Sequence, residues 1–134
     1  ILNEEYSKTI HIEATTLIDM VNRQVLPACT GYAGKVAAAV NAKKLALPTL
    51  ECKSESALIS EITALVDNLE NAVTELEKAV ALSAEYSGSD LAHYTRNSII
   101  PLMDDVRGYA DSLELIVDQK DWPYPTYGEM LFYV

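Results

Sequence analysis

Two histidines are the side chains of this sequence best suited to group transfer. His93 stands in the run Leu-Ala-His-Tyr-Thr-Arg, and an exposed histidine on a helical bundle can relay a phosphoryl group. That role needs small neighbours and a cation beside the ring. Arg96 lies about one helical turn away, but Tyr94 and Thr95 leave no glycine-lined approach for a phosphate. A surface histidine is therefore the preferred interpretation of His93 and of His11, and phosphotransfer is kept as the alternative.

The sequence supports a metal site or a nucleophilic catalytic site even less than it supports phosphotransfer. A carboxylate-bridged metal pair in a bundle needs Glu-x-x-His on two helices, with further acids facing inward. The spacing occurs once, from Asp90 to His93, with Asp in place of Glu, and Lys8 stands three residues before His11. The sequence contains no P-loop, no G-x-G-x-x-G and no G-x-S-x-G. It therefore predicts no catalytic, cofactor-binding or metal-binding residue.

Composition and charge restrict the class of partner. The 134 residues suit one domain with its own core, and 49% of them are hydrophobic. A formal net charge of −10 argues against nucleic acid and against anionic membranes, which both attract cationic surfaces. No apolar run approaches the roughly 18 residues of a membrane span. Cys29 and Cys52 are far apart and are expected to be reduced thiols of a cytosolic protein.

Apolar residues recur at alternating intervals of three and four, which predicts long amphipathic helices. The pattern indicates helices over about 4–46, 54–86 and 89–119, with short connections that make neighbours antiparallel. The expected fold is therefore all-α, an antiparallel up-down bundle of three long helices. Its clearest seam comprises Ile59, Ile62, Val66, Leu69, Val73, Leu76 and Val80.

Prolines interrupt the first and third helices. Pro27 and Pro101 cannot donate a backbone hydrogen bond and clash with the preceding turn, so kinks are expected at both. Residues 4–46 form either one kinked helix, which is preferred, or two helices that break near residues 27–31. One helix would be roughly 60 Å long, against about 45 Å for its neighbour. Its N-terminal part is therefore expected to project beyond the bundle.

The C-terminal segment, 121–134, differs from the helices. Its two prolines favour an extended path, and five aromatic residues lie within it. It is expected to be ordered, packed either on the end of its own bundle or on a neighbouring surface. The candidate interface residues are Trp122, Tyr124, Tyr127, Met130, Phe132 and Tyr133.

The run Trp-Pro-Tyr-Pro-Thr-Tyr-Gly-Glu-Met-Leu-Phe at 122–132 resembles the C-terminal end of type III glutamine synthetases. Residues 5–14 resemble the segment that follows their catalytic domain. The run Ile-Ile-Pro-Leu-Met at 99–103 stands where the family has its last long helix. The resemblance extends over essentially the whole chain, and the tail is its most specific part.

The resemblance implies a parent enzyme that makes glutamine from glutamate, ammonia and ATP with Mg or Mn ions, assembled from stacked hexameric rings. The family's nucleotide, metal and substrate motifs lie upstream, so no catalytic residue is transferred to this sequence. Residues 1–134 are then expected to be a single non-catalytic domain, a fragment of a longer cytoplasmic chain. The expected partners are its own catalytic domain and neighbouring subunits, contacted through the first helix and the tail. The alternative is a free-standing signalling or adaptor module that uses His93.

Overall fold

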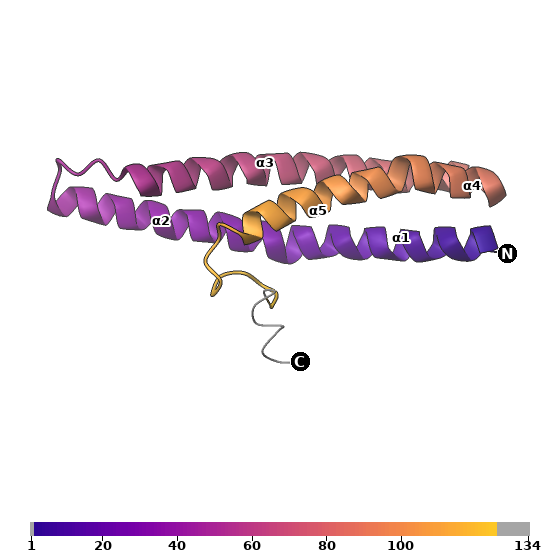
Figure 1. Cartoon of the computed structure of the whole chain (residues 1–134), viewed down its shortest axis with the longest axis horizontal. Coiled ribbons are helices and arrows are strands. Elements are labelled where there is room, and N and C mark those ends of the chain that lie inside the picture. Colours follow the sequence, from indigo (N-terminus) through magenta and orange to yellow (C-terminus); the bar gives the residue numbers. More distant parts are fainter. Residues whose placement is uncertain (1, 126–134) are drawn as a thin grey trace.

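A computed structural model describes residues 2–125 of the chain, with side-chain exposure from residue 4 onward. Within this range the chain forms three long helical rods lying side by side, and no strand occurs in it. Consecutive rods run in opposite directions (Figure 1). The all-α bundle predicted from the spacing of apolar residues is confirmed.

The first rod contains a π-helical turn near its centre. It consists of α1 (Leu2–Met20), the π turn η1 (Val21–Val25) and α2 (Leu26–Ala46). The residues at both junctions keep right-handed helical dihedrals, so the rod continues through Pro27, the second residue of α2. The question of one helix or two is thereby answered in favour of one rod.

The third rod repeats this arrangement. It consists of α4 (Gly88–Tyr94), the π turn η3 (Thr95–Ile99) and α5 (Ile100–Glu114), with Pro101 as the second residue of α5. Proline lacks an N–H and its ring clashes with the carbonyl four residues earlier. A π turn just upstream changes the hydrogen-bond register at that carbonyl. The kinks at Pro27 and Pro101 stay predictions, and the structural feature beside both prolines is a π turn.

The middle rod contributes more residues to the core than either of its neighbours. It is α3 (Lys53–Leu82), followed by the short 3₁₀ turn η2 (Ser83–Glu85). Within the predicted seam, Ile59 and Val80 are half-buried and the five positions between them are buried. Facing rods supply the rest of the core. The fully buried side chains of the first and third rods include Val21, Cys29, Ile99, Met103, Val106 and Leu113.

The last helix ends at Glu114, five residues before the predicted end at 119. Apolar spacing continues to Ile116, but the N–H groups of Ile116 and Val117 both donate to the carbonyl of Leu113. This tight turn stops the helical ladder and directs the chain back toward the first rod. Hydrogen bonding at the terminus therefore decides the end, and the apolar pattern does not.

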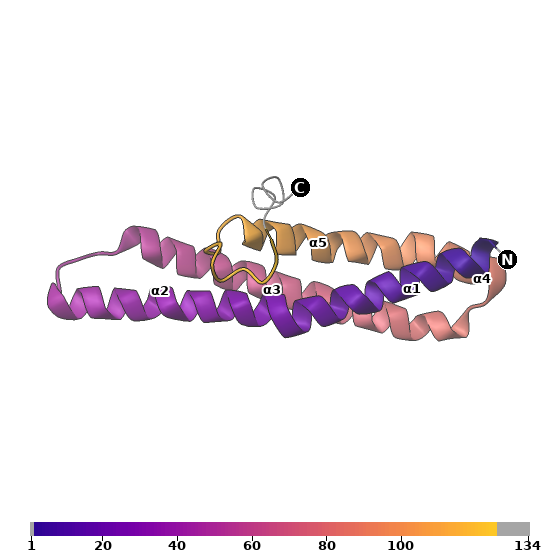
Figure 2. The same cartoon turned by 90° about the horizontal axis from the view of Figure 1, so that it is seen from below.

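The expected projection of the first helix at its N-terminal end is wrong. α1 packs beside α4 and α3 along its length, and the opposite end of the molecule projects (Figures 1 and 2). There α2 and the start of α3 continue past the end of α5 as a two-helix hairpin. The reason is that the third rod begins beside α1 and is shorter than its neighbours. Every side chain from Asn41 to Glu51 is consequently exposed.

Gly88 provides a test of the turn between the second and third rods. Its φ of +58° is left-handed, and a Cβ there would meet no atom within 4 Å. Gly88→Ala is therefore expected to lower the free energy of unfolding by about 1–2 kcal/mol through backbone strain alone. The matched control is Gly34→Ala, also in open space but inside α2, which should raise stability by up to about 1 kcal/mol. Urea denaturation measures both, and equal effects would contradict the left-handed assignment.

Candidate functional site

His93 lies in an environment that is poor for phosphate. It is exposed and lines a hollow of about 540 Å³ whose acidic residue is Asp90. The Arg96 guanidinium lies over the ring of Tyr6, 5.8 Å from its centroid, and does not line this hollow. An acid and no cation therefore face the imidazole, and this surface repels a phosphoryl group.

A pair of tyrosines forms the wall beside His93. The rings of Tyr86 and Tyr94 stack with centroids 4.4 Å apart and planes 14° from parallel. The Tyr94 hydroxyl donates to the backbone carbonyl of Ala79 at 2.7 Å, and burial raises the pKa of that hydroxyl. The pair joins α4 to the end of α3, so its role is to hold the two helices together.

His11 borders another hollow, of about 320 Å³, between α1 and α4. Glu4 and Lys8 supply its charges, and the buried Ser7 hydroxyl has no hydrogen-bond partner among the described residues. Such a hydroxyl can hydrogen-bond a water molecule or another small polar group. No group of three His, Cys, Asp or Glu side chains in residues 2–125 is placed to hold a metal ion.

The described part of the C-terminal tail packs on its own bundle. The N–H groups of Asp121 and Trp122 donate to the carbonyl of Asp118, which turns the chain after α5. Trp122 is 8% exposed and belongs to the core, and Asp121 forms an ion pair with Lys35 of α2. Of the six residues predicted for an interface, Trp122 and Tyr124 thus contact their own domain. Tyr127, Met130, Phe132 and Tyr133 lie outside the described residues, and their interface role stays a prediction.

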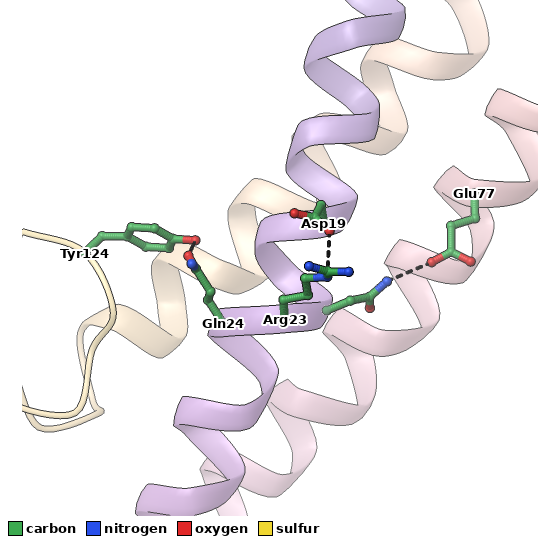
Figure 3. A network of polar contacts seen from close by, with 6 residues as sticks. Asp19, Arg23, Gln24, Glu77 and Tyr124 are labelled. Atoms are coloured by element: carbon green, nitrogen blue, oxygen red, sulfur yellow. Dashed lines mark hydrogen bonds and ion pairs between the residues drawn. The ribbon is translucent and has the colours of Figure 1, made fainter.

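The π turn η1 contacts the middle rod and the tail through polar side chains (Figure 3). Asn22 donates to Glu77 of α3 at 3.1 Å, and Gln24 accepts a hydrogen bond from the Tyr124 hydroxyl in the tail. Arg23, between them, pairs with Asp19 at 3.1 Å. Sequence reasoning missed this junction. The available signal was a run of three polar residues just before Pro27.

Three leucines of the projecting hairpin are exposed. Leu45, Leu47 and Leu50 are 86%, 58% and 40% exposed, and we call them the leucine end. Beside them, Lys43 donates to Glu55 at 3.0 Å across the two helices. That hydrogen bond lowers the pKa of Glu55 and raises the pKa of Lys43. Sequence reasoning treated this segment as a plain connection, although Leu-Ala-Leu-Pro-Thr-Leu is unusually apolar for a turn.

Comparison with known proteins gives these surfaces a context. The family model of the glutamine synthetase C-terminal domain matches residues 1–44, of which 2–44 lie within the first rod. The chain is also 34% identical over 140 aligned residues to the type-3 glutamine synthetase of Dictyostelium discoideum. The chain belongs to the type III glutamine synthetases as a C-terminal domain.

Two further relatives agree with this assignment. A glutamine synthetase of Butyrivibrio fibrisolvens is 30% identical, and one of Bacteroides fragilis is 25% identical. The three alignments cover 98%, 98% and 96% of this C-terminal domain but only 19%, 19% and 18% of the relatives. The domain therefore spans about a fifth of the length of these glutamine synthetases, and a free-standing signalling module is not favoured. In residues 2–125 no helix combines the length and apolarity that crossing a bilayer requires.

Proposed function

We propose that this domain has a structural role within a cytoplasmic glutamine synthetase, an enzyme that joins ammonia to glutamate at the expense of ATP. ATP and Mg or Mn ions then belong to a catalytic domain elsewhere in the parent chain. Support comes from the names of the relatives and from the bundle itself, whose seams are filled by apolar side chains. The domain contributes contacts to that catalytic domain or to a neighbouring subunit.

The observation that carries this proposal is the leucine end. A leucine side chain gains about 1.5–3 kcal/mol when it is transferred from water into an apolar contact. Monomeric proteins rarely leave several such side chains together on an otherwise unsupported projection. Of the three lysines near the leucines in the sequence, Lys43 and Lys53 are paired with Glu55 and Glu51, at 3.0 Å in each case. The surface that receives the leucine end is therefore apolar.

The test uses the full-length enzyme with Leu45→Ser and Leu47→Ser combined. Loss of two apolar contacts is expected to weaken association at least about tenfold, since 1.4 kcal/mol corresponds to a factor of ten. Light scattering after size-exclusion chromatography, over a dilution series, measures this shift. The matched control is Leu115→Ser, because Leu115 is also 86% exposed but lies just beyond α5. Identical dissociation profiles for the double variant and the unmodified enzyme would refute a contact at the leucine end.

A further inference from the structure

Two adjoining hollows form a groove along α1, beside α5. The first, of about 160 Å³, begins at Trp122 and Tyr124. The second, of about 340 Å³, extends along α1 to Ile12, whose side chain is 60% exposed. Leu17, Met20 and Arg107 line both hollows, so the two are continuous. We call this surface the tail groove, because it starts where the described part of the tail ends.

We propose that residues 126–134 of the same chain bind in the tail groove, as a strap along α1. Their sequence is Thr-Tyr-Gly-Glu-Met-Leu-Phe-Tyr-Val, which is rich in large apolar side chains that suit an apolar floor. From Met20 to Ile12 the groove measures about 12 Å along the helix axis. Nine extended residues reach up to about 30 Å, so the segment is long enough to follow it.

Tethering favours this segment over any other occupant. The Tyr124 hydroxyl donates to Gln24, and Trp122 is buried beside the first hollow, so the chain is anchored at the entrance to the groove. A short tether gives the following residues a local concentration in the millimolar range. A segment from another molecule has to compete with that concentration. The exposed Ile12 side chain is the apolar surface that the strap covers.

Charge assigns one contact within the groove. Glu129 is the one acid among residues 126–134. Arg107 is the one cation lining the groove, and its contact with Asp104 is a loose 3.7 Å. The other charged lining residues are Glu13, Asp111 and Glu114, which repel a carboxylate. Glu129 therefore pairs with Arg107.

Disulfide trapping tests the strap in the 134-residue domain. Thr16 is exposed and lines the groove, so Thr16→Cys is combined with Met130→Cys and with Cys52→Ser. Cys29 is retained, because burial raises the pKa of its thiol to about 11 and keeps it protonated and slow to react. Mild oxidation at low protein concentration, followed by peptide mass spectrometry, is expected to show an intramolecular 16–130 disulfide. The control pair places the first cysteine at Asn71→Cys, exposed on α3, and should remain reduced.

A charge exchange makes the test independent of folding defects. Arg107→Glu in the trapping background is expected to lower the intramolecular yield about fivefold, a shift of about 1 kcal/mol. Adding Glu129→Arg should restore the yield, because the pair is then reversed. Equal trapping at positions 16 and 71, or disulfides only between molecules, overturns the strap. An unchanged yield in Arg107→Glu overturns the Glu129 contact.

Discussion

Trp122→Ala is expected to lower the free energy of unfolding by about 3–5 kcal/mol. The indole is 8% exposed and closes the junction between α1, η1 and α5. Its removal merges the lost volume with the neighbouring hollow of about 160 Å³ and detaches the tail from the bundle. Urea denaturation followed by circular dichroism is the appropriate measurement, since the chain contains one tryptophan and the variant has no indole fluorescence.

Trp122→Phe separates apolar burial from hydrogen bonding at the same position. The indole Nε1 is buried without a hydrogen-bond partner in the described structure, which is unfavourable. Phenylalanine keeps an aromatic ring and removes that donor, so the loss of stability should stay below about 1.5 kcal/mol. A loss below 1 kcal/mol for Trp122→Ala would show that the indole is not part of the core. Trp122→Ala should also abolish the disulfide between the cysteines introduced at positions 16 and 130, because the strap then loses its anchor.

Leu69→Ala is the second large effect, with an expected loss of about 2–5 kcal/mol. Leu69 is fully buried near the centre of α3 and belongs to the hydrophobic core. Alanine leaves a cavity that rigid helix packing fills only in part. The matched control is Leu82→Ala at the end of the same helix, where the side chain is 51% exposed. It should lose less than about 1 kcal/mol.

Thermal and urea unfolding of these two variants distinguish a packed bundle from a loose one. Similar losses at positions 69 and 82 would indicate that the seam is not tightly packed, against the burial of its central residues. A loss confined to Leu69 supports cooperative packing of the three rods. The leucine end lies at the connection between α2 and α3, whereas the tail groove is lined by residues of α1 and α5. These elements are separate in the fold (Figure 1), so the two tests are independent of each other.

The helices and their buried faces were predictable from the sequence. Apolar side chains at intervals of three and four lie on one side of a helix whatever its neighbours are, so this information is local. The seam positions Ile62, Val66, Leu69, Val73 and Leu76 are accordingly buried. The resemblance of residues 122–132 to the type III glutamine synthetases was also contained in the order of residues alone.

Other features were decided by the tertiary structure. A periodic seam specifies which side of a helix is buried but leaves its position along the axis open. The place where the third rod starts and stops decides that the leucine end projects and that α1 does not. Hydrogen bonds to the Leu113 carbonyl end α5 early, and this brings Trp122 onto its own bundle. The projection of the leucine end and the burial of Trp122 depend on contacts between residues far apart in the chain, and the spacing of apolar residues within one helix does not encode them.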